Sequence, residues 1–386
     1  MMKHTKWLLC LVAVLGLSNR NQAQPPPEPT PGSDSSVSFP LGPMSSRPAS
    51  LPTAVTTDPA PVCDASASGL FAEAGVYVLH PYFSGNPAYF TTFANTSTTP
   101  GPTATTSINA EAGRKEFDYG MSVSPWVSLG YEWDDGAKVR VRWWHFDEDA
   151  NVSTVNTDAS GGTSITSATA QGFTLHSPGP GLIAGVGPDV LSFHSDLQLE
   201  VIDAEVAREL RFHDWVVEVA GGARYVHLSE HYLGTLSNSG TTQALTITDS
   251  AELFSRHHFD GAGPTLALGV RWPCGNTGFS LYGNARGSLV FGSNEQDAAL
   301  GSDVTRVGAT TTTTREVSRS AGVSRSDLLP ILEMELGAEY RMDLGRVHPY
   351  LRAGLVGQTW FNAGNASGLG NDLGLLGVAA TAGLDF

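Results

Sequence analysis

Long apolar runs, cysteine and positive charge are all scarce in this sequence of 386 residues, and each scarcity excludes a class of protein. Beyond the N-terminal region, no segment approaches the ~20 consecutive apolar residues of a membrane-spanning helix. The three cysteines are too few for a disulfide scaffold and lack metal-ligand spacing. The formal net charge of −16 argues against nucleic acid as a partner. A soluble protein and a β-barrel, whose strands carry no long apolar runs, both fit these absences.

The N-terminal region carries the features of a secretory signal peptide over residues 1–23. Lys3 and Lys6 precede an apolar run that ends at Leu17, and a small residue suited to cleavage follows at position 23. Residues 24–67 are rich in Pro, Ser and Thr, a composition that cannot bury a core. We therefore expect a secreted chain that begins with a disordered periplasmic arm.

From residue 68 onward, apolar residues alternate with small or polar ones, which is the pattern of β-strands. A tilted barrel strand needs ~9–11 residues to cross the hydrocarbon, and the segments are at least that long. The predicted strands cover residues 70–82, 119–133, 137–147, 196–212, 215–231, 256–272, 278–291, 329–342, 347–361 and 373–386. The pattern predicts that residues 68–386 form an all-β domain, a transmembrane antiparallel up-and-down β-barrel of about ten strands, or twelve.

The connections between these strands alternate between short and long. The short ones are turns with Asp, Asn or Gly, at Asp134–Gly136, His213–Asp214, Pro273–Thr277 and Asp343–Arg346. The long ones are rich in Ser and Thr, poorly patterned and predicted to be loops, at 83–118, 148–195, 232–255, 292–328 and the shorter 362–372. This alternation is typical of bacterial outer-membrane barrels, whose tight turns face the periplasm and whose long loops face outward.

The predicted strands have one apolar and one charged face. In the strand over 137–147, Val139 and Val141 alternate with Arg140 and Arg142. An arginine facing lipid at the bilayer midplane costs about 2–4 kcal/mol, so an apolar face in lipid would place the charges inside. The inverse arrangement describes a soluble barrel such as a lipocalin, and alternation does not choose between them. The residues expected to line the lumen are Arg140, Arg142, Glu200, Asp203, Glu205, Glu218, Arg224, Arg286, Glu333, Glu335, Glu339, Arg341 and Arg352.

Aromatic residues at the strand ends favour the membrane-spanning barrel. One group lies beside the short turns, at Trp133, Trp215 and Trp272. A second group lies near the starts of the long connections, at Tyr82, Phe83, Trp143, Trp144, Tyr232, Phe291, Trp360 and Phe361. Two such belts match the two membrane interfaces. The final Phe386 resembles the signal that barrel assembly machinery reads, so we expect that machinery and outer-membrane lipid as partners.

The strand over 196–212 is irregular. Leu197, Leu199 and Val201 share one face, but the apolar residues continue on the opposite one from Ile202 onward. A β-bulge near Val201–Ile202 would restore the phase, and a misassigned lipid face would explain the pattern equally well.

Cys63 and Cys274 both lie on the periplasmic side of this predicted topology. Because the periplasm permits disulfides, a bond between them would pin the arm across the barrel mouth. The alternative is two unpaired thiols, which alkylation of the native protein would reveal.

With its strands assigned, the sequence resembles the Legionella-type pore-forming major outer membrane proteins, a family with planctomycete-like relatives, over Ser68–Phe386. The resemblance rests on the order of the segments Ala72–Leu79, Pro81–Phe83, Val139–Asp147, Leu199–Glu205, Gly221–Tyr225, Phe259–Pro264, Leu281–Ser288 and Leu336–Tyr340. It implies a pore-forming role in the outer membrane and supplies no catalytic residues.

Diffusion of small hydrophilic solutes or ions through a charged lumen is the first predicted function. The alternative is a closed structural or adhesive barrel whose charges pair across the lumen. A rim hydrolase is a third class, in which a His–Asp pair acts as general base or neighbouring imidazoles bind a metal. Its residues would be His145, Asp147, His231, His257, His258 and Asp260. The primary prediction is a protein that is not an enzyme, with no cofactor and no metal site.

Overall fold

The computed structural model describes residues 68–386, apart from 100–104, 159–161, 178–186, 214, 242–244, 276, 309, 311 and 369. The predicted signal peptide, the arm and Cys63 lie outside the described residues. Cys274 is exposed in a turn. Because Cys63 is not described, a disulfide between the two cysteines stays a prediction. Among the described residues, no helix combines the length and hydrophobicity that crossing a membrane requires.

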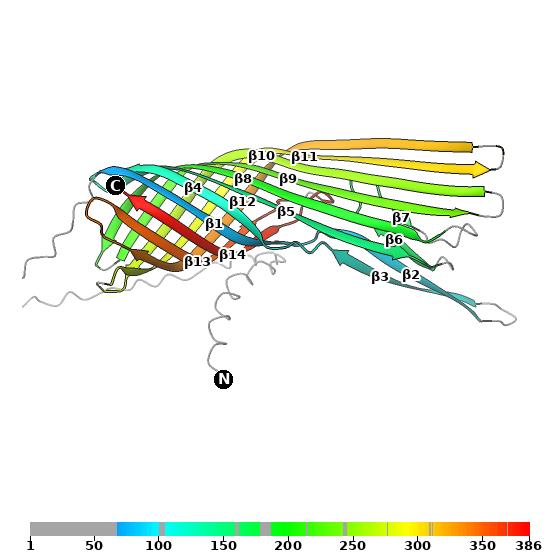
Figure 1. The fold of residues 1–386 in the computed structure, drawn as a ribbon, viewed down its shortest axis with the longest axis horizontal. Helices are drawn as coiled ribbons and strands as arrows, with labels where there is room; N and C mark the ends of the chain where they lie inside the picture. The colour runs from blue at the N-terminus through cyan, green and yellow to red at the C-terminus, as the bar shows by residue number, and fades with distance from the viewer. Residues whose placement is uncertain are drawn as a thin grey trace, which may run out of the picture. The chain divides into compact units, whose positions relative to one another are not determined.

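Ten strands close into an antiparallel barrel (Figure 1). They are β1 (Gly69–Phe83), β4 (Ser122–Glu132), β5 (Ala137–Asn156), β8 (Asp189–Phe212), β9 (Trp215–Thr241), β10 (Leu245–Pro273), β11 (Phe279–Gly308), β12 (Thr312–Arg341), β13 (His348–Trp360) and β14 (Leu373–Asp385). Because β1 pairs with both β4 and β14, the ring has no free edge. The predicted barrel of about ten strands is confirmed.

The predicted short turns join β4 to β5, β8 to β9, β10 to β11 and β12 to β13. Glycines adopt the positive φ angles that these turns need, 76° at Gly136 and 84° at Gly345. All four turns lie at one end of the barrel, which we call the short-turn end and which in bacterial barrels faces the periplasm. The opposite end is called the long-loop end.

The prediction of loops is wrong for most of 232–255 and 292–328, where β9–β12 continue, and for the two ends of 148–195, where β5 and β8 continue. β11 has 30 residues, whereas β13 has 13, and Figure 1 shows β9–β11 running far past β13. The extensions of β11 and β12 are largely polar on both faces and so carry little alternation, whereas those of β8–β10 place Leu191, Phe193, Leu236 and Leu253 on the inner face. Backbone pairing and the strand preference of Thr nevertheless extend the ladder beyond the membrane.

A second sheet of four strands also lies within the predicted loops. It consists of β2 (Pro87–Thr99), β3 (Thr105–Glu116), β6 (Thr163–Ser167) and β7 (His176–Ser177), in the order β3-β2-β6-β7. β2 and β3 form a hairpin within 83–118, while β6 and β7 come from 148–195. The long connections are therefore structured where the sequence predicted irregular loops.

The apolar faces of the barrel strands point outward, which decides the question that the alternation left open. Leu266 is 70% exposed and Val206 is 63% exposed, although both lie in the middle of long strands. Trp215 and Trp272 stack at the short-turn end with ring centroids 5.7 Å apart, as an interfacial belt requires. An exposed apolar band around a closed barrel is the surface that lipid covers.

The outward side chains also mark where the hydrocarbon ends. On β9 and β10, the outward residues of Trp215–Tyr225 and Ala262–Trp272 carry no charge. The next outward residues toward the long-loop end are His227 and Asp260. We therefore take Trp215–Tyr225 and Ala262–Trp272 as the membrane-spanning segments of these two strands.

The second aromatic belt is thinner than predicted. Tyr82, Trp143 and Phe291 face outward, but Trp144 and Trp360 are fully buried inside the barrel. Neighbours in a strand point to opposite faces, so Trp143 and Trp144 could not both reach the interface.

The predicted bulge near Val201–Ile202 is absent. β8 keeps one unbroken register with β5 and β9 through this point. Leu197, Leu199 and Val201 therefore face inward together with Asp203. The change of pattern reflects a change in what fills the barrel, from charged to apolar.

Leu266→Arg should destabilise the barrel by about 2–4 kcal/mol, because a guanidinium would enter the hydrocarbon on the outward face of β10. Reversible unfolding in phospholipid vesicles measures the loss. Thr248→Arg is the control, since this outward position of the same strand lies beyond the apolar band. Equal effects of the two substitutions would contradict the assigned spanning segment.

Candidate functional site

The interior of the barrel holds most of the charged residues that the sequence singled out. The structure places on the inner face Arg140, Arg142, Asp203, Glu205, Glu218, Arg224, Arg286, Glu333, Glu335, Glu339, Arg341 and Arg352. They occupy the half of the barrel nearer the short-turn end. We call this set the charge lattice.

Three guanidinium groups share two carboxylates at the centre of the charge lattice. Arg224 is fully buried; its Nε donates to Asp203 at 2.6 Å and its Nη1 to Glu333 at 2.7 Å. Arg142 lies 2.9 Å from Asp203 and 3.4 Å from Glu333. Arg286 approaches both carboxylates at 3.3 and 3.4 Å. Each carboxylate is thus surrounded by opposite charge.

These ion pairs cross the lumen. Arg142 lies on β5 and Glu333 on β12, two strands that are not neighbours in the barrel. Arg286 on β11 likewise reaches Glu205 on β8, at 2.9 Å. The bridges therefore tie opposite walls together. In the described arrangement, side chains occupy the centre of the barrel at this level.

Nearer the short-turn end, the charge lattice continues in smaller groups. Arg140 bridges Glu205 and Glu218 at 2.7 Å each. Arg352 donates to Glu339 at 2.6 Å. The phenol of Tyr282 donates to Glu335 at 2.6 Å, and Arg341 pairs with Asp385 at 2.7 Å.

Glu200 is a correction to the predicted lining set. It faces outward, where its carboxylate accepts a hydrogen bond of 2.9 Å from the indole Nε1 of Trp143. The prediction placed Glu200 inside because it assumed a bulge in β8, which would have put Glu200 and Asp203 on one face. Without the bulge, their separation of three residues puts them on opposite faces.

An apolar layer follows the charge lattice toward the long-loop end. The rings of Trp144 and Trp360 meet edge to face with centroids 6.2 Å apart, and Tyr77 packs on Trp144 at 6.2 Å. The other inward residues of this layer are Leu79, Phe146, Leu199, Leu228, Phe259, Val290, Leu329 and Leu373. These side chains are almost completely buried, so they fill the barrel.

Beyond the apolar layer, a segment that follows β13 folds into the barrel. Residues 362–368, which we call the inner loop, include the buried Ala366 and Asn365. The carbonyl of Ala366 accepts hydrogen bonds from Ser255 at 2.6 Å and from Gln296 at 2.8 Å. Both donors lie on inner faces of the barrel. Hydrogen bonds therefore hold the inner loop inside the barrel.

The inner loop packs around a buried carboxyl group that sequence reasoning missed. Glu230 lies beyond the membrane-spanning segment of β9, and it accepts hydrogen bonds from Asn86 at 2.9 Å and Ser195 at 3.2 Å. Burial raises the pKa of Glu230 from 4.5 to about 8, although these donors oppose the shift. Counting by twos along β9 from Arg224 would have placed Glu230 inside.

His257 stands directly opposite Glu230 on β10 and is also fully buried. Burial lowers its pKa to about 4, while a hydrogen bond with Asn294 at 3.0 Å opposes the shift. Both side chains are therefore uncharged between about pH 4 and pH 8. The pair of Glu230 and His257, around which the inner loop packs, therefore carries no charge over that range.

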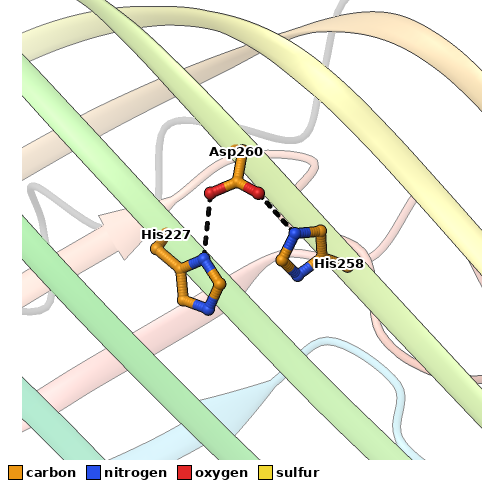
Figure 2. A group of neighbouring side chains, drawn as sticks. All are labelled: His227, His258 and Asp260. Atoms are coloured by element: carbon orange, nitrogen blue, oxygen red, sulfur yellow. Dashed lines mark hydrogen bonds and ion pairs between the residues drawn. The ribbon is translucent and has the colours of Figure 1, made fainter.

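The residues predicted for a rim hydrolase are divided between the two faces. His257 points inward, whereas His145, Asp147 and His231 face outward. His231 hydrogen-bonds Asp196 at 2.7 Å. His258 and Asp260 also face outward and meet His227 there (Figure 2). The structure thus does not bring the predicted set together at one site.

A closed antiparallel barrel with an apolar outer band and charges inside defines a β-barrel protein of the outer membrane. More particularly, the chain belongs to the family described as Legionella pneumophila major outer membrane protein precursor, whose model matches residues 67–379. The predicted family and its location in the outer membrane are confirmed. A search of the curated proteins finds no match to this chain.

Several solved structures of outer-membrane proteins are similar to this chain at low identity. The outer membrane protease OmpT from Escherichia coli is 9% identical with a TM-score of 0.37, and the match covers 82% of this chain and 96% of that one. The Pseudomonas putida toluene transporter TodX is 8% identical with a TM-score of 0.20, covering 82% and 89%. A Pseudomonas aeruginosa FadL homologue is 10% identical with a TM-score of 0.19, covering 82% and 90%. Likenesses this distant carry no argument about function.

Arg224→Met should cost about 3–5 kcal/mol of stability, because it leaves Asp203 and Glu333 buried with fewer counter-charges. The expected loss is near the lower end, since Arg142 and Arg286 remain. Denaturant unfolding measures it. Arg256→Met is the matched control; its pair with Asp297 is about half exposed and should contribute less than about 1 kcal/mol. Similar losses for both variants would contradict the lattice.

The inner loop should become more sensitive to protease as pH rises from 6.5 to 8, and no more sensitive above 8. The raised pKa of Glu230 stabilises the closed loop fully below pH 4.5, and this contribution is lost as pH rises to about 8. His257 is neutral in the closed state and at least half unprotonated in the open one above pH 6.5, so its contribution in this range is small and opposite in sign. Mass spectrometry would locate and quantify cleavage within 362–368.

Glu230→Gln is the control for this experiment. It keeps the shape of the side chain but removes the titration, so its cleavage should not change beyond the protease's own pH dependence. The same rise in both proteins would show that another group controls the inner loop.

Proposed function

We propose that this protein is a gated channel that passes ions or small hydrophilic solutes along its charged inner face. The charge lattice is the observation that carries the proposal. Buried ion pairs stabilise a protein little, and apolar side chains of the same volume often do so better. A barrel selected only for rigidity would gain nothing from so many inward charges. Inward charges of this kind are explained if they line a polar path for ions across the membrane.

The described arrangement corresponds to the closed state of such a channel. The apolar layer around Trp144 and Trp360 and the inner loop both occupy the lumen. Opening would displace the inner loop, which non-covalent contacts hold, and would turn the two indoles aside. It would also separate the ion pairs that cross the lumen, such as Arg142 with Glu333. Ions would then meet alternating guanidinium and carboxylate groups down to the short-turn end.

A closed structural or adhesive barrel is the second candidate, and the complete burial of Trp144 and Trp360 favours it. In that case the Ser/Thr-rich parts of β8–β12 would present the functional surface. We propose no catalytic function, because the predicted hydrolase residues divide between the two faces. We also propose that the assembly machinery binds the final strand through Phe386, which is exposed.

Purified wild-type protein should give discrete but infrequent conductance steps in planar bilayers. Trp144→Ala should raise the open probability several-fold, because it removes one of the two indole rings from the apolar layer. Trp143→Ala is the matched control, since the adjacent indole faces outward and should leave conductance unchanged.

Silence from the wild type and from Trp144→Ala, with both proteins folded, would reject the channel in favour of the structural barrel. Folding is checked by the heat-dependent mobility of the barrel on gels. An equal increase in conductance for Trp143→Ala would show that the apolar layer is not the gate.

A further inference from the structure

Three potential metal ligands meet on the outer face of the barrel, outside the lumen. Asp260 on β10 stands directly opposite His227 on β9, and His258 lies two residues before Asp260 on the same face. The ligand atoms of the three side chains all lie within 4.8 Å of one another. Among the described residues it is the one group of three or more such ligands that could hold a metal, and it belongs to no part of the proposed channel.

The carboxylate of Asp260 lies between the two imidazoles (Figure 2). One oxygen is 2.9 Å from Nδ1 of His227, and the other contacts Nε2 of His258. The phenol of Tyr225 also donates to Asp260, at 2.8 Å. The side chains of His227, His258 and Asp260 are between about a quarter and two fifths exposed, so an ion could reach them from outside.

The backbone fixes this group in place. Paired β-strands position all three residues, and β8 and β11 pair with the other edges of β9 and β10. No loop has to move to bring the ligands together. A site carried on paired strands holds its ligands more rigidly than one carried on loops.

We propose that His227, His258 and Asp260 bind a divalent transition-metal ion, with Zn²⁺ as the best-suited probe. Two imidazoles and one carboxylate match the nitrogen and oxygen ligands that Zn²⁺ takes, and three protein ligands leave one position for water. Coordination needs an unprotonated ring nitrogen, and a neutral imidazole supplies it by carrying its proton on the other nitrogen. Protons compete with the metal for these nitrogens, so affinity falls as the pH is lowered. Hard cations such as Mg²⁺ prefer oxygen ligands and should bind poorly.

The surroundings of the group favour a cation. Glu200, the residue misassigned to the lumen, stands opposite His227 on β8 and faces outward. Its carboxylate, which accepts a hydrogen bond from Trp143, adds a second negative charge on the neighbouring strand. The site lies just beyond Tyr225, where the apolar band ends.

Isothermal titration of the EDTA-treated, detergent-solubilised protein with ZnCl₂ tests the proposal. One ion per chain should bind, and the affinity should fall as pH drops from 7.5 to 5.5. His227→Gln, His258→Gln and Asp260→Asn should each weaken binding at least about tenfold, since losing even an outer-shell partner costs 10–100-fold. Co²⁺ bound at the same site should give visible absorption bands that these variants lose.

His231→Gln is the matched control. His231 faces outward on the same strand, its side chain is 32% exposed like that of His227, and it pairs with a different carboxylate, Asp196. This variant should bind Zn²⁺ like the wild type. Absence of stoichiometric binding, equal loss in His231→Gln, unchanged affinity in the three ligand variants, or displacement by equimolar Mg²⁺ would each overturn the proposal.

Discussion

The cost of exposing an ionised side chain to lipid is the constraint from which this structure follows. Because successive residues of a strand point to opposite faces, every charge in the spanning segments must lie on the inner face. Once inside, a charge needs a partner, and partners come from opposite walls as readily as from adjacent strands. The contact of Arg142 on β5 with Glu333 on β12 is the result. Crossing the membrane and closing the lumen are thus consequences of the same alternation.

The lipid constrains the outer face alone, so the inner face can change its chemistry along the strand. On β8 it passes from Asp203 to Val201 and Leu199 without any break in register. This freedom allows one wall to carry the charge lattice, the apolar layer and the neutral pair of Glu230 and His257 in succession. A channel with such layers has its gate and its polar path at different depths.

The sequence predicted the number of spanning strands and their turns, because those depend on alternation that lipid enforces. The alternation left the lipid face open, and only the aromatic residues at the strand ends favoured the apolar face. It failed where that enforcement stops. Beyond the membrane, β11 and β12 are polar on both faces, so their extensions resembled loops. Inside the barrel, apolar residues such as Leu199 disguised the inner face of β8, which led to the false bulge and to the wrong placement of Glu200. Trp360 was assigned to an interface because the sequence shows that the residue is aromatic but does not show whether its side chain points into the lumen or outward.

The edge of the apolar band separates two regions with different rules. Up to Tyr225, an outward residue of β9 must be uncharged; from His227 onward, it is free to ionise. Outward ionisable side chains at this edge are partly exposed to solvent. Inward ionisable side chains at the same depth are buried, so they must be neutral or paired. Asp260 and Glu230 show the contrast. They lie at nearly the same depth on paired strands, where Asp260 is opposite His227 and Glu230 is opposite His257, but Asp260 faces outward and Glu230 inward. Asp260 is therefore open to exchange with external ions and Glu230 is not, which distinguishes the proposed metal site from the proposed gate.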